Sequence, residues 1–556
     1  MKTARLLRVA AAAVVPAFSS PLIAQQTEMV VTADRIYTSD DYRPVVQAFL
    51  IRGDRVVFAG SLREVRAKAS RTARTMSFPG RTIIPGMVDA HAHLLGLGQS
   101  LLRVRLQGST TFDEVVSRIA SRVGGTKKGE WITGRGWDQN IWPVKDFPSH
   151  DALSRAVPDN PVFVDRVDGH AALANALAMK LAGVTAATKD PEGGRIVRDA
   201  QGNPTGVFVD NATSLIERVI PSTGRPQLTK AVTAAIAEAN KWGLTGIHDA
   251  GQSRRTIEIY EELARAGRYN LRNYVMVSGD SADVRYYTTR GPRSNLYGGR
   301  LWVRSIKLYA DGALGSRGAA MLQPYSDDPN NVGLLLTPQR ELQRITDMAL
   351  RAGFQVATHA IGDRGNRVAL DVYDSALRKN PVADHRFRVE HAQVISLEDI
   401  PRFAQLGVIP SMQGSHQTSD MGWAENRVGH DRIRGAYAWR SLLDQGSIIP
   451  NGSDFPVEDV NPLLSFHAAV TRQDPSNRPP GGWYPEQRMT REEALKAMTL
   501  WPAYAAFQEK IMGSLSPGKY ADFVVLDSDI MRVPVDQILR SNVISTWLGG
   551  KAVYTR

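Results

Sequence analysis

The sequence contains no cysteine among its 556 residues. This excludes disulfide bonds, thiolate metal ligands and a cysteine nucleophile, so any catalytic chemistry must use histidine, carboxylates, lysine, hydroxyl groups or a metal. The sequence also lacks a block in which basic residues alternate with aromatic ones, although its net charge is +12. A dispersed basic excess is typical of a solvated surface, and we therefore expect no nucleic-acid partner.

Long apolar runs are scarce, and the clearest one lies at the N-terminus. Basic residues as far as Arg8 precede an apolar run over residues 9–15, and small residues follow as far as Ala24. This layout predicts a secretory signal peptide at residues 1–24 and a periplasmic or secreted mature protein without a membrane span. The alternative is an N-terminal helix that stays on the protein.

The two ends of the remaining chain share one pattern. Short β-like runs broken by Gly, Asp and Pro occupy residues 25–84, and the same pattern returns over residues 506–556. We expect the two ends to form one small β-sandwich beside a larger domain. A chain of this length exceeds one small core and is compatible with a large barrel that carries additions.

The middle of the chain has an α/β pattern, in which strand-like runs alternate with segments of helical spacing such as residues 228–242 and 338–352. This alternation predicts a parallel sheet or barrel. Nine candidate strands occur, at residues 87–93, 161–167, 244–251, 273–278, 303–312, 354–363, 387–394, 407–413 and 447–454.

A (β/α)8 barrel has only eight strand positions, so one candidate is surplus. Residues 94–243 are far longer than a helical crossover needs, which makes the run at residues 161–167 the surplus strand. We predict an inserted subdomain at residues 109–229, with the barrel at residues 85–108 and 230–505.

The first predicted barrel strand carries two histidines, His91 and His93, separated by one residue. In a strand their side chains emerge on the same face, where two imidazoles can bind one metal. The pair lies near the carboxyl end of the strand, which is where barrel enzymes place their chemistry.

A lysine in a later strand is the second unusual feature. Lys307 shares a strand face with Ser305 and Tyr309, and burial of an ammonium group lowers its pKa. A neutral amine beside metals can react with carbon dioxide to form a carbamate, which is an anionic oxygen ligand. The alternative is a lysine paired with Asp311 or with another carboxylate.

Three further strand ends complete a predicted metal site. His359 and His391 each end an apolar strand, and Asp454 ends the last one. The predicted metal ligands are therefore His91, His93, Lys307, His359, His391 and Asp454, from five strands. Zinc suits this set of nitrogen and oxygen donors, and manganese, iron or cobalt are alternatives, as one or two ions.

Several other polar and aromatic residues are candidates for holding a substrate, and for each of them a purely structural role is an equal alternative. They are Trp137, Asp138, His170, Asp311, Arg317, Gln413 and His416, with His248 as a further residue that could face the pocket. The tryptophans Trp131, Trp137 and Trp142 favour a substrate with an apolar or aromatic portion.

The motifs PGMVDAHAH, GWDQNIW, VDGHAALAN, GLTGIHDAG, KLYADGALGSRGAA, THAIGDRGN, VEHAQ, GSDFPVEDVNPL and GSLSPGKYADFVVLD resemble the amidohydrolase superfamily, in particular its amidohydrolase-3 or YtcJ-like branch, which includes N-substituted formamide deformylases. The resemblance implies a distorted (β/α)8 barrel, a β-sandwich from both termini, and metal-dependent hydrolysis at carbon–nitrogen bonds. It also implies the histidine and aspartate ligands and, by analogy with binuclear relatives, a carboxylated Lys307. The stretch SMQGSHQTSD departs from the usual Gln-Pro-containing version.

These observations predict a hydrolase that cleaves an amide-type bond of a small molecule with metal-activated water. Asp454 is the expected general acid and base, accepting the proton of the water and passing it to the leaving nitrogen. One alternative is an esterase, lactonase or phosphotriesterase-like enzyme, and another is an exported binding protein without catalysis. A homodimer is open beside a monomer.

Overall fold

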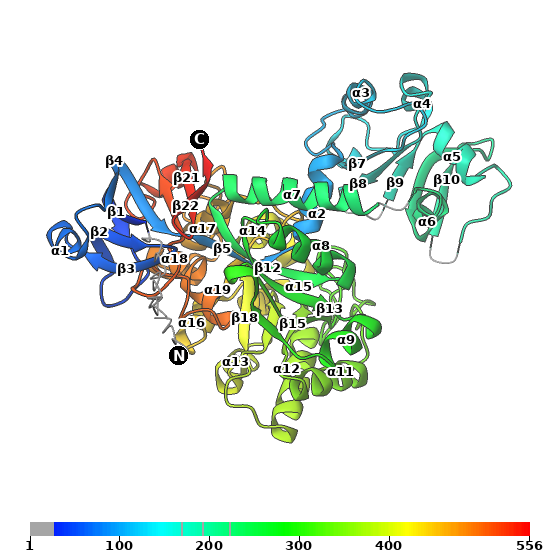
Figure 1. The fold of residues 1–556 in the computed structure, drawn as a ribbon. Coiled ribbons are helices and arrows are strands. Elements are labelled where there is room, and N and C mark those ends of the chain that lie inside the picture. Colours follow the sequence, from blue (N-terminus) through cyan, green and yellow to red (C-terminus); the bar gives the residue numbers. More distant parts are fainter. Residues whose placement is uncertain (1–26, 168–170, 192–193, 222–223) are drawn as a thin grey trace, which may run out of the picture.

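A computed structural model describes residues 27–167, 171–191, 194–221 and 224–556. It has three parts, a central barrel, a β domain built from both ends of the chain, and a smaller domain that projects from the barrel (Figure 1). The predicted signal peptide and His170 lie outside the described residues. Among the residues that are described, no helix combines the length and the apolar character needed to cross a membrane.

The barrel consists of parallel strands with helices around them. In sheet order its strands are β5 (Met87–Ala92), β12 (Leu244–Gln252), β13 (Arg272–Ser278), β15 (Leu301–Tyr309), β16 (Gln355–Ala360), β17 (Arg388–His391), β18 (Ile409–Gln413) and β19 (Asn451–Gly452). These are the eight strands predicted for the barrel, and the order in the sheet follows the order in the sequence. The predicted TIM-like barrel is therefore confirmed.

Amphipathic helices cover the outside of the barrel. They include α7 (Arg225–Lys241), α8 (Arg254–Arg265), α9 (Ser281–Thr288), α11 (Gln339–Arg351), α12 (Asp363–Lys379), α13 (Ile400–Leu406), α16 (Trp439–Asp444) and α17 (Pro462–Thr471). Two of them, α7 and α11, coincide with the two segments whose spacing predicts helices. Each presents a row of buried apolar residues toward the sheet.

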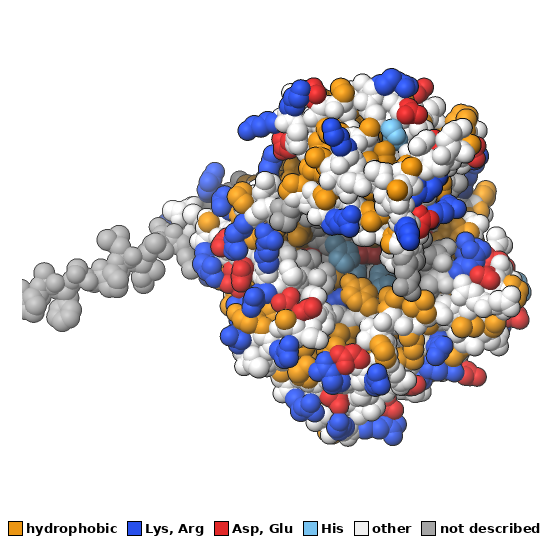
Figure 2. Space-filling model, turned by 90° about the vertical axis from the view of Figure 1, so that its right-hand side faces the viewer, with side chains coloured by type: hydrophobic (Ala, Val, Ile, Leu, Met, Phe, Trp, Pro, Cys, Tyr) orange, Lys and Arg blue, Asp and Glu red, His pale blue; other side chains and the backbone are white. Residues whose placement is uncertain are grey.

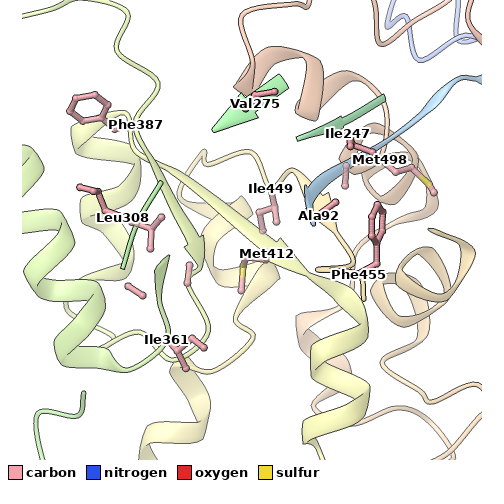
Figure 3. Packing of buried hydrophobic residues seen from close by; sticks show 14 of the residues in the cluster. Ala92, Ile247, Val275, Leu308, Ile361, Phe387, Met412, Ile449, Phe455 and Met498 are labelled. Carbon is pink, nitrogen blue, oxygen red and sulfur yellow. The ribbon is translucent and has the colours of Figure 1, made fainter. Parts of the chain in front are cut away.

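The strands alternate between the core and the barrel interior. On β15, Ile306 and Leu308 are buried in the main hydrophobic core, and Figure 3 shows Leu308 as part of the same cluster as Val275 of β13 and Ile247 of β12. Because successive side chains of a strand point to opposite faces, Lys307 points into the barrel. Burial of each such apolar side chain stabilises the fold by about 1.5–3 kcal/mol.

Closure of the barrel brings its first and last strands together. The amide of Asp454 donates to the carbonyl of His91 at 2.8 Å, and the amide of His93 donates to the carbonyl of Phe455 at 2.9 Å. Gly452 of β19 lies so close to β5 that a Cβ atom on residue 452 would be 2.5 Å from the amide nitrogen of His91. The strands can therefore approach this closely only because residue 452 has no side chain.

The β domain joins the two ends of the chain in one sheet. Its order is β22 (Lys551–Thr555), β21 (Val543–Leu548), β20 (Phe523–Leu526), β4 (Arg74–Pro85), β1 (Glu28–Tyr37), β2 (Val45–Arg52) and β3 (Arg55–Gly60). The rings of Phe49 on β2 and Phe523 on β20 are 5.3 Å apart, although two strands separate β2 from β20. The sheet therefore curls until its halves pack face to face, as in the predicted sandwich.

The third domain is inserted between the first two barrel strands. Its sheet has the order β10 (Gly194–Arg198), β11 (Pro204–Asp210), β9 (Ala171–Ala174), β8 (Val162–Arg166), β7 (Ile132–Trp137) and β6 (Val104–Arg105). The surplus candidate strand is β8 of this sheet. The sheet begins at β6, a few residues before the predicted boundary at residue 109, and the barrel helix α7 begins at Arg225.

Substitution of Gly452 tests the barrel closure. We expect Gly452→Ala to lower the free energy of unfolding by about 1–3 kcal/mol, because the added methyl group overpacks the junction of β5 and β19. Thermal unfolding of the purified variant measures this. Gly124→Ala is the matched control, since a Cβ at Gly124 meets no atom within 4 Å, and equal unfolding temperatures for both variants would contradict the proposed tight junction.

Candidate metal centre

The carboxyl ends of the barrel strands surround a cavity of about 420 Å³. Figure 2 shows histidine side chains (pale blue) at the bottom of a hollow, with apolar side chains (orange) beside them. The cavity brings together all of the predicted metal ligands, which are His91, His93, Lys307, His359, His391 and Asp454. It also brings in His416, which the sequence suggested only as a substrate contact.

Within this cavity Asp454 belongs to two groups whose ligand atoms lie within 4.8 Å of one another. One group contains His91 and His93, and the other contains His391 and His416. The oxygen Oδ1 of Asp454 is 3.0 Å from Nε2 of His93, and Oδ2 is 3.6 Å from Nε2 of His416. His359 and Lys307 line the same cavity outside these two groups.

Hydrogen bonds behind the site orient three of the imidazoles. Nδ1 of His91 lies 2.5 Å from a carboxylate oxygen of Glu390, and Nδ1 of His93 lies 3.1 Å from the carbonyl oxygen of Ala250. Nδ1 of His391 lies 2.8 Å from Oε1 of Gln413. Because these oxygens only accept, each Nδ1 carries the proton, and each Nε2 keeps the lone pair that a metal ligand needs.

Burial keeps most of these imidazoles neutral. It lowers the pKa of His91 to about 4 and that of His359 to about 3, and the positive charge of Lys307 adds to both shifts. Burial and the neighbouring imidazoles hold the pKa of His391 well below its usual value. At neutral pH these rings are therefore in the unprotonated form that binds metals.

Asp454 carries the negative charge of the site. Burial acts to raise the pKa of its carboxyl group, but the hydrogen bond to His93 and the surrounding imidazoles outweigh burial and hold the pKa well below the usual range. The same contact raises the pKa of His93 against the effect of burial. The carboxylate is therefore ionised and attracts a cation.

The atoms that face each other at the centre fit a metal ion. With its proton on Nδ1, His93 presents a lone pair from Nε2 to the carboxylate oxygen of Asp454 only 3.0 Å away. Two acceptors at that distance need a shared proton or a cation. Nε2 of His416 is also buried without a hydrogen-bond partner among the described residues, although such groups are rarely left unsatisfied.

The backbone is unusual at two of the candidate ligands. His391 has a φ of 72° and Asp454 a φ of 63°, which is the left-handed region that residues with a Cβ atom seldom adopt. Such conformations persist where the surrounding structure enforces them, and they are frequent in active sites. The fold therefore holds both side chains at the cavity against a local conformational preference.

Lys307 is buried next to the imidazoles, and no carboxylate of the described residues forms an ion pair with it. Its Nζ lies 3.1 Å from Nε2 of His91, and burial lowers its pKa to about 8. Asp311, the partner suggested by the sequence, instead accepts hydrogen bonds from the backbone amides of Ala320, Ile361 and Gly362. Asp311 thus anchors two loops and is not among the residues that line the cavity, although its Oδ1 lies 3.8 Å from Nε2 of His359.

Several predicted substrate contacts lie elsewhere. Trp137 is fully buried in the core of the inserted domain and donates from its indole to Val164, and Trp142 packs beside it. Trp137 and Trp142 therefore stabilise the inserted domain, and their presence no longer indicates an aromatic substrate. Asp138 of the same domain forms an ion pair with Arg166 at 2.6 Å.

Arg317 and Gln413 each contact a structural partner, and His248 lies behind the candidate metal ligands. Arg317 pairs with Asp327 outside the cavity, and Gln413 supports His391 from behind. His248 lies below the cavity, where it binds Arg388. Only His416 of the predicted substrate contacts lines the cavity among the described residues.

The sequence reasoning missed most of the cavity wall. Apolar and aromatic side chains there include Tyr309, Leu314, Trp423 and Val457, and acidic ones include Asp420 and Glu458. Apart from Tyr309 at the end of β15 and Asp420 at the end of the helix α14 (Gly414–Asp420), they belong to loops that follow the strands, where spacing carries no signal. The buried charges Arg388 and Glu390 were also missed, although two charged residues on the same face of an apolar strand are a recognisable sign.

Comparison with known proteins agrees with this geometry. YtcJ of Bacillus subtilis is 32% identical to the chain over 94% of its length and 98% of the relative. An N-substituted formamide deformylase of Arthrobacter pascens is 27% identical over 96% of the chain and 99% of the relative. The crystal structure of a metal-dependent hydrolase from Pyrococcus horikoshii is 27% identical and superposes with a TM-score of 0.76, covering 92% of this chain and 99% of that one.

The sequence profile of the Amidohydrolase family, Amidohydro_3, matches residues 77–554. This range contains the whole barrel, the inserted domain and every candidate metal ligand. The chain therefore belongs to the amidohydrolase family, in the branch of YtcJ-like amidohydrolases.

Proposed function

We propose that this hydrolase cleaves a carbon–nitrogen bond of amide type in a small molecule and that it depends on a divalent metal. The observation that carries the proposal is the convergence of all six candidate ligands on one cavity, where Oδ1 of Asp454 lies 3.0 Å from Nε2 of His93 and a cation or a shared proton can bridge the two atoms. The deformylase and the metal-dependent hydrolase among the similar proteins support it. A cavity of about 420 Å³ is in the size range of small-molecule sites.

The residues that would hold the metal are the imidazoles of His91, His93 and His391, the carboxylate of Asp454, and the two outer groups His359 and Lys307. Zinc matches these nitrogen and oxygen donors. When bound, a divalent metal lowers the pKa of a coordinated water toward 7 and polarises the substrate carbonyl group.

Asp454 is the group of this chain that moves the proton. Because its carboxylate is ionised at neutral pH, it accepts a proton from the attacking water as the new carbon–oxygen bond forms. It then gives this proton to the nitrogen that leaves when the carbon–nitrogen bond breaks. The products are a carboxylic acid and an amine, and no further reactant is needed.

Lys307 supplies a carboxylated side chain in this proposal. Its amine is buried, its pKa is about 8, and among the described residues no carboxylate pairs with it. Attack of the neutral amine on carbon dioxide forms a nitrogen–carbon bond and releases a proton, and the resulting carbamate places a negative charge beside His91. This negative charge would offset the positive charge of the bound metal.

We also propose that the protein acts outside the cytoplasm after its N-terminal segment has been removed, on a small-molecule substrate and without nucleic acid. Support comes from the sequence of residues 1–24 and from the dispersed basic charge.

Removal of the metal tests the function. We expect chelation of the purified protein to abolish hydrolysis of N-formyl and N-acyl amines, and addition of zinc or manganese to restore it. Elemental analysis before and after chelation measures the metal content. A matching ester at equal metal content separates amidase from esterase activity, and undiminished amide hydrolysis by metal-free protein would refute the proposal.

Replacement of the proton-transferring group is a second test. We expect Asp454→Asn to fold and to retain part of its metal, and to lose at least about 100-fold in kcat, since proton transfer commonly contributes 10²–10⁴-fold. Asp459→Asn is the control, because Asp459 lies in the same loop and is exposed. Turnover by Asp454→Asn within a few-fold of the wild type would remove Asp454 from this role.

The carbamate has its own test. After exposure to ¹³C-bicarbonate, the metal-loaded protein should show a carbamate carbon signal by NMR that disappears in Lys307→Ala. Lys519→Ala is the control, because Lys519 of the β domain also has a pKa lowered by burial but lies outside the cavity. Absence of a carbamate signal in the wild type would show that Lys307 acts as a free amine.

A further inference from the structure

A layer of buried charge lies beneath the metal centre and has no place in the mechanism above. Arg388 and Glu390 of β17 and His248 of β12 are each at most 1% exposed. Barrel interiors are usually filled by apolar side chains, and a small apolar cluster of Ala250, Met276 and Ala357 is present here. Three polar groups among them therefore need an explanation.

We propose that Glu390 is a positioning residue that fixes His91 as a metal ligand, and that Arg388 and His248 hold Glu390 in place. This inference rests on the proposed metal-dependent function. Residues outside the cavity thereby gain a role in metal affinity. This role does not follow from the similarity to other proteins.

The first link is the contact between Glu390 and His91. Oε2 of Glu390 lies 2.5 Å from Nδ1 of His91, and neither side chain is exposed to solvent. A carboxylate can only accept here, so the imidazole must donate from Nδ1 and direct the lone pair of Nε2 at the centre. The contact selects the tautomer, stops rotation of the ring, and increases the electron density of the ligand nitrogen.

The second link keeps Glu390 ionised and immobile. Nε of Arg388 is 2.7 Å from Oε1 of Glu390, and a terminal nitrogen of the same guanidinium donates to Oε2 at 3.1 Å. Burial acts to raise the pKa of Glu390, but Arg388 and His91 outweigh it and hold that pKa well below the usual range. The carboxylate is therefore ionised at neutral pH, and Arg388 holds it in place.

The third link fixes Arg388 itself. Its terminal nitrogens donate to Nδ1 of His248 at 2.7 Å, to the carbonyl of Ala90 at 2.7 Å and to the hydroxyl of Ser411 at 2.8 Å. These partners belong to strands β12, β5 and β18, so the guanidinium is held from three sides. Because arginine only donates, His248 must accept with Nδ1 and is neutral.

A purely structural role is the alternative, and a second buried pair in this chain allows a comparison. Arg272 binds Asp522 through two contacts of 2.6 and 2.8 Å, and this pair is also almost inaccessible. Arg272 is the first residue of β13, at the end of the barrel opposite the cavity. If a buried ion pair only stabilises the fold, loss of either pair should affect stability alone. Of the two, only the pair of Arg388 and Glu390 contacts a candidate metal ligand.

The experiment compares metal affinity in the two pairs. Metal-free Glu390→Gln and Asp522→Asn are titrated with zinc below their unfolding temperatures, and cobalt is then used to record the ligand-field absorption. Glutamine keeps the shape but removes the charge, so we expect Glu390→Gln to bind zinc about 10–100-fold more weakly and to shift the cobalt spectrum. Asp522→Asn should lose stability and keep the wild-type affinity and spectrum.

Each other outcome has a definite meaning. Wild-type affinity in folded Glu390→Gln, or an equal loss of affinity in Asp522→Asn, overturns the inference and leaves the proposed function intact. If Glu390→Gln does not fold, Glu390→Asp decides, because it keeps the charge and withdraws it from Nδ1. Unchanged zinc affinity in that variant also overturns the inference. If the wild-type protein binds no divalent metal, the proposed function fails and the inference fails with it.

Discussion

The backbone hydrogen bond between the amide of Asp454 and the carbonyl of His91 is the contact on which the rest of this structure depends. It joins the last barrel strand to the first and so closes the sheet. The same contact fixes the distance between the first and the last candidate ligand, which lie more than 350 positions apart in the sequence. Closure of the barrel and assembly of the centre are thus one event.

The electrostatics of the centre follow from this enclosure. Burial removes protons from the imidazoles of His91, His359 and His391, while the carboxylate of Asp454 keeps its charge. The result is a group of lone pairs around one carboxylate, beside the buried amine of Lys307. Unprotonated imidazoles and an ionised carboxylate are the donors that divalent metals bind, which supports the proposed metal dependence.

Sequence reasoning predicted the fold, and it selected residues that meet at one cavity, because both depend on local periodicity. Apolar strands that alternate with amphipathic helices predict the barrel, and the position of a histidine at a strand end predicts which way it points. Trp137 and Arg317 could not be assigned in this way, because a buried tryptophan and one that lines a pocket look alike in a sequence. The contact between Glu390 and His91 could not be predicted from the sequence either, because the two residues lie 299 positions apart and only the folded barrel brings them together.

The curled sheet of the β domain constrains the order in which the chain can fold. Strand β4, at residues 74–85, pairs with β20, at residues 523–526, so the segment made first completes its hydrogen bonds only when nearly all of the polypeptide has left the ribosome. Until then β4 presents an open edge, which is prone to pairing with other chains. A chain with this topology cannot complete its first sheet during synthesis, so its N-terminal strands are exposed to wrong pairing until the C-terminal strands arrive.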